Sequence, residues 1–276
     1  MKEFSQKKIA LVNDVTGFGR CSIAVALPII SALKVQCCFL PTAILSNHTG
    51  FDNFFFEDYT PKMREYIDSW SKIGLSFDAI CTGFLGSEEQ IDIVIEFLQR
   101  FKTTENIIII DPVMGDYGKL YSTYTDGMCK KMQHLIEFAN VVTPNLTELC
   151  RLLDLPYPEN TPNHDELYLL CKKLSMQGPE KIVITGLQRD GYIENFIFEN
   201  DQPYKIIKVK KVGEDRSGTG DVFTSIVSAS IVKGEDFAMS VEKAANFISK
   251  SLIFTNNLNL PTNCGVCFEE FLTELK

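Results

Sequence analysis

The chain has 276 residues, with 27 Lys and Arg against 36 Asp and Glu, so its formal net charge is −9. Hydrophobic residues make up 45% and charged residues 23%, which is ordinary for a globular protein and enough to offset the entropy of ordering the chain. The acidic balance, with no basic run or stripe, argues against a nucleic-acid partner.

The first residues, Met1–Lys8, precede only a short apolar run and do not form an export signal. No stretch approaches the roughly 20 apolar residues that span a bilayer, so no membrane contact is expected. Nine cysteines in a chain without an export signal indicate a reducing compartment. We therefore expect a cytoplasmic protein with free thiols.

Short runs rich in Ile and Val alternate with segments of helical period. The predicted strands are Lys8–Val12, Val35–Thr42, Phe77–Thr82, Asn106–Asp111, Asn140–Thr143 and Lys181–Thr185. The predicted helices between them are Ser22–Ala32, Pro61–Ile73, Glu88–Phe101, Gly127–Phe138, Leu146–Leu153 and Asp165–Met176. This alternation is typical of a doubly wound α/β fold with a mostly parallel sheet.

The run Ile107–Ile110 has no polar alternation, as expected for a strand buried on both faces of a sheet. After Thr185 the pattern changes to an antiparallel hairpin, followed by two more helices. The hairpin strands are Tyr192–Phe198 and Tyr204–Val209, and the helices are Asp221–Val232 and Phe237–Phe254. Because no Gly/Ser linker interrupts the chain, we expect residues 1–276 to form one domain without a separate lid domain.

The segment Ser217–Asp221, with the sequence Ser-Gly-Thr-Gly-Asp, directly precedes an apolar helical run. Glycines let backbone N–H groups converge at a helix start, which suits an anion cradle. An aspartate there fits a base that faces a phosphoryl group during transfer. The alternative, equally supported by this segment alone, is a glycine-rich turn with Asp221 as an ordinary first-turn acid.

Two further clusters follow buried strands. Asp111 and Asp116 stand on either side of a Pro/Gly turn, where two carboxylates suit a hydrated Mg²⁺ or bond local backbone N–H groups. Asn145 and Glu148 could add oxygens to such a site. Their alternative is a helix start with Asn145 as cap and Glu148 three residues later.

Together the motifs Asp-Pro-Val-Met-Gly-Asp (111–116), Thr-Pro-Asn-x-x-Glu (143–148) and Gly-Thr-Gly-Asp (218–221) resemble the ribokinase-like superfamily of small-molecule kinases. Ser46-Asn47-His48-Thr49 resembles a signature of its pyridoxal/pyridoxamine kinase branch. The similarity runs from about Ile9 to Phe254. It implies a ribokinase-like kinase that phosphorylates the 5′-hydroxymethyl group of a vitamin B6 vitamer with ATP.

The resemblance also implies roles for single residues. Asp221 is the expected base, and Gly218, Thr219 and Gly220 are the expected anion hole. The expected ATP-binding residues are Asp111, Asp116, Thr143, Asn145, Thr185 and Thr219. Mg²⁺ is expected at Asp111, Asp116, Asn145 and Glu148, through waters as often as directly. Tyr117–Thr125 is expected to be a mobile loop over the ATP phosphates, with Gly115 and Gly118 as hinges.

On the acceptor side, the expected substrate-binding residues are Asn13, Asp14, Gly19, His48, Thr49, Phe84, Tyr121 and Asp221. Many pyridoxal kinases carry a serine after the first strand and a tyrosine in the Thr-Gly-x turn, where this chain has Asn13-Asp14 and Phe84. Phe84 can stack on a pyridine ring but has no hydroxyl. Asp14 either pairs with a cationic amine, which favours pyridoxamine, or only caps the helix beyond Gly17-Phe18-Gly19.

Several alternatives remain beside this prediction. A hydroxymethylpyrimidine kinase shares the scaffold, and a non-catalytic vitamer-binding protein could use it without chemistry. A sugar kinase is disfavoured because no lid insertion follows the first strands. A nicotinamide-dependent oxidoreductase is excluded because Ser22 stands where its fingerprint needs a third glycine. The resemblance implies a homodimer and leaves a monovalent-cation requirement open.

Overall fold

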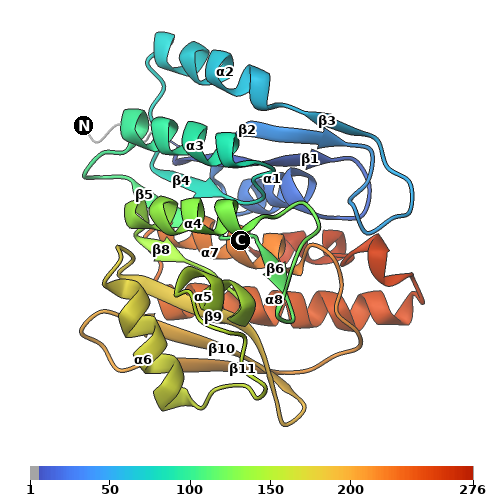
Figure 1. Cartoon of the computed structure of the whole chain (residues 1–276). Helices are drawn as coiled ribbons and strands as arrows, with labels where there is room; N and C mark the ends of the chain where they lie inside the picture. The colour runs from blue at the N-terminus through green and yellow to red at the C-terminus, as the bar shows by residue number, and fades with distance from the viewer. Residues whose placement is uncertain (1–5, 276) are drawn as a thin grey trace.

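Nine strands pair into one sheet in the computed structural model, which describes residues 6–275 (Figure 1). Their order across the sheet is β11-β10-β9-β8-β5-β4-β1-β2-β3. The neighbours from β9 to β2 are parallel, whereas β3, β10 and β11 pair antiparallel at the two edges. The strands are β1 (Lys8–Thr16), β2 (Gln36–Leu45), β3 (Phe56–Asp58), β4 (Ala79–Thr82), β5 (Ile107–Ile110), β8 (Val141–Val142), β9 (Lys181–Arg189), β10 (Tyr192–Glu199) and β11 (Lys205–Lys210).

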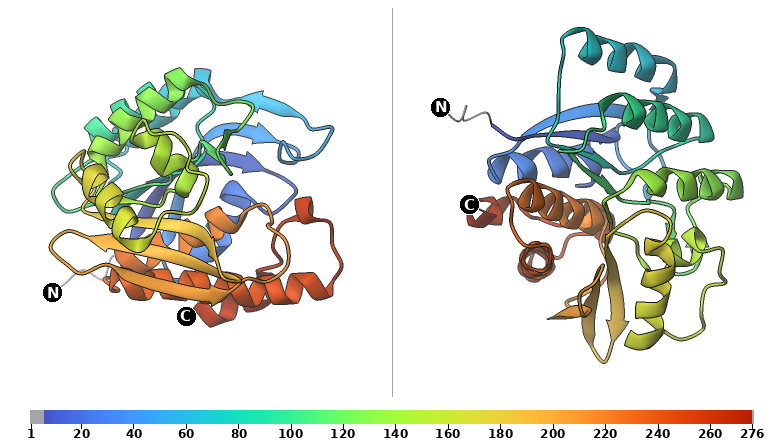
Figure 2. Two further views of the ribbon diagram at one scale, coloured as in Figure 1. Left: turned by 60° about the horizontal axis from the view of Figure 1, so that its bottom comes forward. Right: turned by 90° about the vertical axis from the view of Figure 1, so that its left-hand side faces the viewer.

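Helices cover both faces of this sheet, as the edge-on view shows (Figure 2, right). One face carries α1 (Ser22–Ala32), α7 (Thr219–Val232) and α8 (Phe237–Asn257). The other carries α2 (Thr60–Lys72), α3 (Glu88–Phe101), α4 (Asp126–Leu135), α5 (Leu146–Leu152) and α6 (His164–Ser175). Short 3-10 turns lie at η1 (Ile136–Phe138), η2 (Thr262–Cys264) and η3 (Glu269–Leu275). The predicted doubly wound, mostly parallel architecture is confirmed.

Strand β5 shows why this sheet is stable with helices on both sides. Ile108 and Ile110 lie in the core beneath α2–α6, and Ile109 lies in the core beneath α1, α7 and α8; all three are fully buried. Successive side chains of a strand point to opposite faces, so an all-isoleucine strand supplies both cores at once. The prediction of burial on both faces is confirmed.

The structure adds elements that the sequence pattern does not predict. β3 has three residues, all exposed, so it carries no alternation of polar and apolar positions. β1 and β2 continue to Thr16 and Leu45, beyond the predicted strands. Pro41 is tolerated inside β2 because β3 pairs only with residues 43–45, which leaves that side of Pro41 without a ladder partner.

Two other sequence predictions concern the cysteines and the membrane. All nine cysteines are free thiols, as expected. Within residues 6–275 no helix is long and apolar enough to cross a bilayer.

A buried ion-pair network ties the antiparallel edge of the sheet to α6. Glu194 of β10 is 2% exposed, and its carboxylate accepts hydrogen bonds from His164 at 2.9 Å, Lys208 at 3.2 Å and Arg189 at 3.3 Å. Burial would raise the pKa of Glu194, but the hydrogen bonds from His164 and Lys208 outweigh it and hold the pKa below its ordinary value. The three donors come from α6, β11 and β9, so one carboxylate joins four elements.

We predict that Glu194→Gln lowers the free energy of unfolding by about 2 kcal/mol at neutral pH, because it removes a charged acceptor from buried hydrogen bonds. Urea unfolding measures the loss. The lowered pKa means that the wild-type advantage is complete above about pH 4.5 and shrinks as the pH falls below it. The control Glu65→Gln, in an exposed pair with Lys62, should change the unfolding free energy very little. Equal effects of the two substitutions would contradict the prediction.

Candidate active site

The residues singled out from the sequence meet at the carboxyl ends of the parallel strands, where ligands bind in open α/β sheets. Those on strands come from five different strands, on which they lie from the midpoint onward or within two residues after the end, and α7 begins at the same end of the sheet. The strand-end residues are Asn13 and Asp14 on β1, Phe84 after β4, Asp111 after β5, Thr143 after β8 and Thr185 on β9. Segments more than 200 positions apart in the chain therefore share one edge of the sheet.

Asp221 lies in the first turn of α7, and Asn13 holds its carboxylate. The Asn13 side-chain Nδ2 donates to Asp221 Oδ1 at 3.2 Å. The amide oxygen of Asn13 accepts the backbone N–H groups of Asp14 and Phe84, both at 2.9 Å. Because the oxygen is occupied by these two donors, the amide nitrogen must face Asp221. Asn13 therefore fixes the position of the acid from the end of β1.

The Asp221 carboxyl group is an acid with a displaced pKa. Burial raises the pKa, the backbone N–H of Ser22 lowers it, the nearby Asp14 carboxylate raises it and Asn13 lowers it, which leaves it at about 6. The group is thus ionised at neutral pH yet close to the range in which it can take up a proton. This property suits a general base.

Gly218 forms the start of α7 in a left-handed conformation, with φ +80°, and has no side-chain cap. A Cβ at this position would lie 1.8 Å from the backbone oxygen of Arg20. Only glycine therefore allows the segment before α7 to approach the loop before α1. The hydroxyl of Thr219 donates to the backbone oxygen of Arg216 at 3.2 Å and closes the turn. The first N–H groups of a helix have no intrahelical acceptor, so this end of α7 is able to bind an anion.

Asp111 is buried directly after β5. Its carboxylate accepts hydrogen bonds from the hydroxyls of Thr224 at 2.9 Å and Thr143 at 3.1 Å. Burial and repulsion by Asp221 raise the pKa of Asp111 above its ordinary range. Asp111 and Asp221 therefore form a concentration of negative charge that the two hydroxyls only partly offset.

Asn145 and Glu148 form the capping box of α5, which confirms the helix-start alternative for this motif. Glu148 accepts the backbone N–H groups of Asn145 at 2.8 Å and Met114 at 3.1 Å. Asn145 donates to the backbone oxygen of Gly115 at 2.8 Å. Both side chains thus hold the segment after β5 in place. Burial and repulsion by Asp111 raise the pKa of Glu148.

The predicted mobile loop, Tyr117–Thr125, overlaps a tight hairpin of β6 (Gly115–Asp116) and β7 (Lys119–Leu120). Tyr117 and Gly118 both have positive φ angles, as a two-residue hairpin turn requires. The backbone N–H of Gly118 donates to Thr147 of α5 at 2.8 Å. Tyr117 donates its hydroxyl to Asp215, in the loop before α7. In this structure the hairpin is held from α5 and from the α7 side.

Three further residues that the sequence predicts to bind ATP, Mg²⁺ or the substrate lie on or near this hairpin or on β9. Asp116 is exposed and accepts the backbone N–H of Tyr117 at 2.8 Å. This bond is the alternative to Mg²⁺ binding in which the Asp side chain bonds a local backbone N–H. Tyr121 is 46% exposed, and its backbone N–H donates to Met114 O. Thr185 is half-buried on β9, and its backbone N–H donates to Pro144 O at 2.9 Å.

The acids at this edge do not form a preassembled metal cage. Within residues 6–275 no group of three or more His, Cys, Asp or Glu side chains is arranged to hold a metal ion. Repulsion between carboxylates contributes to the raised pKa values of Asp111, Glu148 and Asp221, and none of the three has a Lys or Arg partner among the described residues. A hydrated Mg²⁺, which keeps several waters and takes few protein oxygens, fits this donor set.

His48 makes hydrogen bonds to the protein through both ring nitrogens. The N–H of Gly50 donates to Nδ1 at 3.0 Å, and Nε2 lies 2.8 Å from the backbone oxygen of Asn263. The ring also contacts Phe51, with centroids 4.9 Å apart. Thr49 is exposed beside it. Neither ring nitrogen of His48 is therefore free for a substrate in this arrangement.

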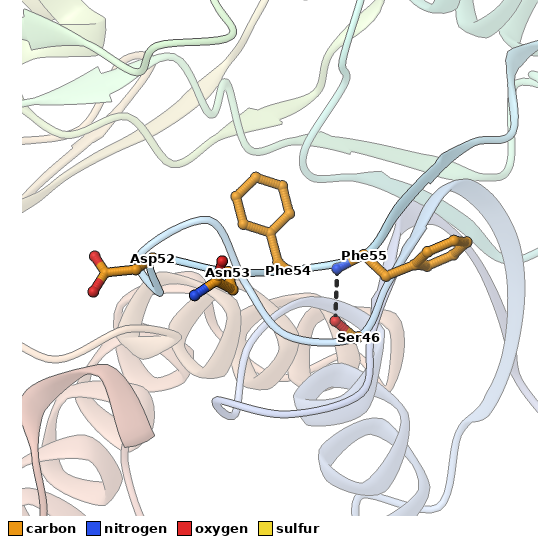
Figure 3. Close-up of a pocket in the computed structure, with 5 residues that line it drawn as sticks. All are labelled: Ser46, Asp52, Asn53, Phe54 and Phe55. Atoms are coloured by element: carbon orange, nitrogen blue, oxygen red, sulfur yellow. Dashed lines mark hydrogen bonds between the residues drawn. The ribbon is translucent and has the colours of Figure 1, made fainter.

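The loop that carries His48 closes on itself at Ser46. The hydroxyl of Ser46 accepts the N–H of Phe55 at 2.8 Å, and Asn47 donates to Asn53 O at 2.9 Å. In Figure 3 the Phe54 and Phe55 rings point to different sides of this loop. The loop borders an open hollow of about 570 Å³. The hollow is lined by loop residues alone, and none of the strand-end acids lines it. We therefore do not place the chemistry there.

Phe84 is half-buried in the turn after β4, and the buried side chain of Gln90 holds this turn in place. The backbone oxygen of Phe84 accepts the Thr42 hydroxyl at 3.0 Å. Gln90 accepts the N–H of Gly86 at 2.7 Å and donates to Thr42 O at 2.8 Å. These bonds hold the Phe84 turn against the end of β2.

Asp14 does not cap α1, so that alternative is wrong. The residue before the helix is Cys21, which makes no side-chain cap. Asp14 is 5% exposed, and its carboxylate accepts the hydroxyl of Thr16. Burial raises its pKa, whereas the hydroxyls of Ser22 and Thr16 lower it. Asp14 is thus a buried carboxylate next to Asp221, with no Lys or Arg ion pair among the described residues and with His48 as the nearby basic side chain.

Sequence reasoning missed three residues of this site. Thr224 could have been found, because it follows Asp221 by three residues on one helix and so faces the same side. Ser22, with φ +55°, supplies a backbone N–H to Asp221, and Arg216 positions the turn before α7. No local pattern marks these two residues.

We predict that Gly218→Ala lowers the free energy of unfolding by at least about 1–2 kcal/mol, the cost of a left-handed conformation, because its Cβ would also clash with Arg20. Gly220→Ala is the matched control: it lies two residues further along, with nothing within 4 Å of a Cβ. That substitution should be neutral or stabilising, because alanine favours helices. Urea unfolding compares the two, and equal losses would contradict the close approach described here.

A model of the phosphomethylpyrimidine kinase family matches residues 25–266. A crystal structure of a Bacteroides thetaiotaomicron protein named as a phosphomethylpyrimidine kinase is 38% identical, covers 100% of this chain and 96% of its own, and has a TM-score of 0.96. Another crystal form of that protein contains pyridoxal, with a TM-score of 0.95.

More distant relatives are named pyridoxal kinases. A pyridoxal kinase of Histophilus somni is 25% identical over 237 residues, which is 82% of this chain and 81% of the relative. A pyridoxal kinase of Leishmania donovani, solved with ADP and pyridoxamine, is 17% identical, with a TM-score of 0.86 over 98% of this chain and 95% of its own. The fold and the family match together show that this chain is a kinase of the ribokinase-like phosphomethylpyrimidine kinase family.

Proposed function

We propose that the protein transfers the γ-phosphoryl group of ATP to the 5′-hydroxymethyl group of a vitamin B6 vitamer. The observation that carries the proposal is the placement of Asp221 in the first turn of α7, beside the anion-binding start of that helix. An acceptor hydroxyl that contacts Asp221 would lie next to a phosphoryl group bound by Gly218, Thr219 and Gly220. This is the alignment that phosphoryl transfer requires.

In the proposed reaction Asp221 takes the proton of the acceptor hydroxyl while its oxygen forms a bond to the γ-phosphorus. The bond between that phosphorus and the bridging oxygen breaks, and ADP leaves. Asn13 keeps the carboxylate oriented toward the acceptor. The backbone N–H groups at the start of α7 stabilise the charge on the transferred group.

The nucleotide side follows from the same geometry. Asp111, Asp116, Thr143, Asn145 and Thr185 lie at the edge where the ATP phosphates would approach. Asp111 and Asp116 are the residues that would hold Mg²⁺ through its waters. Glu148 and Asn145 bond backbone groups with both polar atoms of their side chains, whereas Asp116 does so with one oxygen and Asp111 bonds threonine hydroxyls. When bound, Mg²⁺ would neutralise phosphate charge. The ADP in the related Leishmania kinase supports ATP as the donor.

A B6 vitamer as the acceptor is supported by the side chains of the site and by the similarity to known proteins. Phe84 offers an aromatic face for a pyridine ring, and Asp14 and Asp221 offer hydrogen-bond acceptors. The 38% identical Bacteroides protein contains pyridoxal in one crystal form. The family model, however, is named for phosphomethylpyrimidine kinases, which favours a hydroxymethylpyrimidine as the second candidate acceptor. Both acceptors carry the same hydroxymethyl group on an aromatic ring.

A coupled assay of ADP release distinguishes the candidates. Purified protein is given ATP and Mg²⁺ with pyridoxal, pyridoxine, pyridoxamine or hydroxymethylpyrimidine, and a reaction without acceptor gives the background. We expect kcat/KM to be highest for a B6 vitamer. Turnover confined to hydroxymethylpyrimidine would support the second candidate, and turnover with none of the four would refute both.

We predict that Asp221→Ala lowers kcat by about 10²–10⁴-fold, the usual contribution of a general base, while ATP still binds. Equilibrium binding of ATP and the coupled assay measure the two quantities. Glu214→Gln is the matched control, because this exposed acid lies in the loop before α7 but not at the helix start. A variant that keeps a tenth of the wild-type kcat would remove Asp221 from this role.

The pH profile gives an independent check of the same role. Because the pKa of Asp221 is raised to about 6, its carboxylate becomes protonated as the pH falls through that value and can no longer accept a proton. The kcat/KM of the wild type should therefore fall below about pH 6, and the residual rate of Asp221→Ala should lack this step.

We also propose that Asp14 recognises a cationic amine and so favours pyridoxamine over the aldehyde. Asp14→Asn should lower kcat/KM for pyridoxamine about tenfold more than for pyridoxal or pyridoxine, because it removes one charge-assisted hydrogen bond. The three vitamers act as controls for one another. An equal loss on all three would contradict this role.

A further inference from the structure

Three loops of the site are bonded to one short segment near the end of the chain. We call Leu260–Cys264, which follows α8, the C-terminal strap. His48 lies 2.8 Å from the backbone oxygen of Asn263, and Arg20 donates to that of Cys264 at 3.0 Å. Arg216 donates to Leu260 O and Pro261 O, both at 3.0 Å. In Figure 1 the loop at residues 46–55 and the segment after α8 lie on the same side of the molecule.

The bond of His48 to the strap has a defined direction. The N–H of Gly50 donates to Nδ1, so Nδ1 is an acceptor and the neutral ring carries its proton on Nε2. Nε2 therefore donates to Asn263 O. This bond joins residues 215 positions apart and fixes the acceptor-side loop to the strap.

Gly19 makes this bond possible. Its φ is +112°, and a Cβ at this position would lie 2.2 Å from Cδ2 of His48 and 3.3 Å from Asn263 O. Any side chain would therefore occupy the space through which His48 reaches the strap. The predicted substrate-side pair Gly19 and His48 is explained here by a contact within the protein.

Arg216 makes the matching contact from the phosphoryl side. Two nitrogens of its guanidinium group donate to successive carbonyl oxygens, which uses the fixed fork of the side chain. Its own backbone oxygen accepts the hydroxyl of Thr219. Arg216 therefore holds the turn before α7 through its main chain and the strap through its side chain.

We propose that His48 and Arg216 are positioning residues which act through the strap and couple the acceptor-side loop to the anion-binding start of α7. The proposal rests on the proposed kinase function, because it concerns the same site. His48 bonds the strap at Asn263, whereas Arg216 bonds it two and three positions earlier, at Pro261 and Leu260. If either side chain is released, its loop is no longer bonded to the strap, which is then held by the other side chain and by Arg20.

A double-mutant cycle tests this coupling. His48→Asn removes the donor at the Nε2 position, whereas His48→Gln keeps a donor there. Arg216→Gln removes the positive charge and the two-nitrogen fork, and Arg216→Lys is a milder variant that keeps the charge on a single donor nitrogen. The controls are His134→Gln and Arg100→Lys, which alter an exposed His134–Glu137 pair and an exposed Arg100–Asp68 pair. Thermal unfolding reports whether each variant is folded.

We expect His48→Asn and Arg216→Gln each to lower kcat/KM about tenfold, because each releases its loop from the strap. Tenfold corresponds to about 1.4 kcal/mol. The double variant should also lose about tenfold, since either release uncouples the same strap. His48→Gln should restore most of the loss. Arg216→Gln should raise KM for the acceptor as well as for ATP, although Arg216 lies on the phosphoryl side.

Losses that multiply to about a hundredfold would overturn the proposal, and so would a His48→Gln variant as impaired as His48→Asn. If Arg216→Gln does not fold, Arg216→Lys takes its place in the cycle with His48→Asn. If His48→Asn does not fold, the acceptor KM of Arg216→Gln decides, and an unchanged acceptor KM would overturn the proposal. Wild-type turnover is measured first. If the wild type acts only on hydroxymethylpyrimidine, the B6 assignment fails while the strap is still tested with that acceptor.

Discussion

The arrangement of the site depends on the hydrogen bond from Asn13 to Asp221. It joins the end of the first strand to the start of the seventh helix, two points separated by 208 positions in the chain. The oxygen of the same Asn13 amide accepts the backbone N–H of Phe84, so this side chain also positions the turn after β4. One buried amide thus aligns the acid with the aromatic residue on the acceptor side.

The structure concentrates negative charge around this bond. Asp14, Asp111, Glu148 and Asp221 all have raised pKa values, each of them mainly through burial. Such a group of unpaired acids lowers stability unless cations or hydrogen-bond donors offset it. Hydroxyls of Thr143 and Thr224 and the N–H groups at helix starts supply part of this offset. A cation that arrives with the phosphates would supply the rest.

Much of the architecture could be predicted because buried strands leave a strong signal. The all-isoleucine run of β5, the motifs after β5 and β8 and the motif at the start of α7 indicated both the sheet and the end of its strands that carries the site. Short exposed elements left no such signal, and β3 is a three-residue strand with no buried position. The motif at Asn145 and Glu148 could equally cap a helix or bind a metal, and its spacing fits both roles. The structure shows the cap.

The hydrogen bond between His48 and Asn263 could not be predicted from the sequence. The partner of His48 is a backbone oxygen, and any residue type can supply one, so no side-chain pattern identifies Asn263. The same holds for the carbonyl oxygens that bind Arg216. Long-range contacts to the main chain become visible only when the fold is known.

The central claim is that Asp221 faces the acceptor hydroxyl and the transferred phosphoryl group together. The most direct measurement is a crystal structure with pyridoxal and a non-hydrolysable ATP analogue. The account predicts the 5′-hydroxyl oxygen within about 2.6–3.2 Å of the Asp221 carboxylate and the γ-phosphoryl group against the N–H groups of Gly218–Gly220. A pyridoxal hydroxyl that points away from Asp221 while the phosphoryl group occupies that cradle would contradict it.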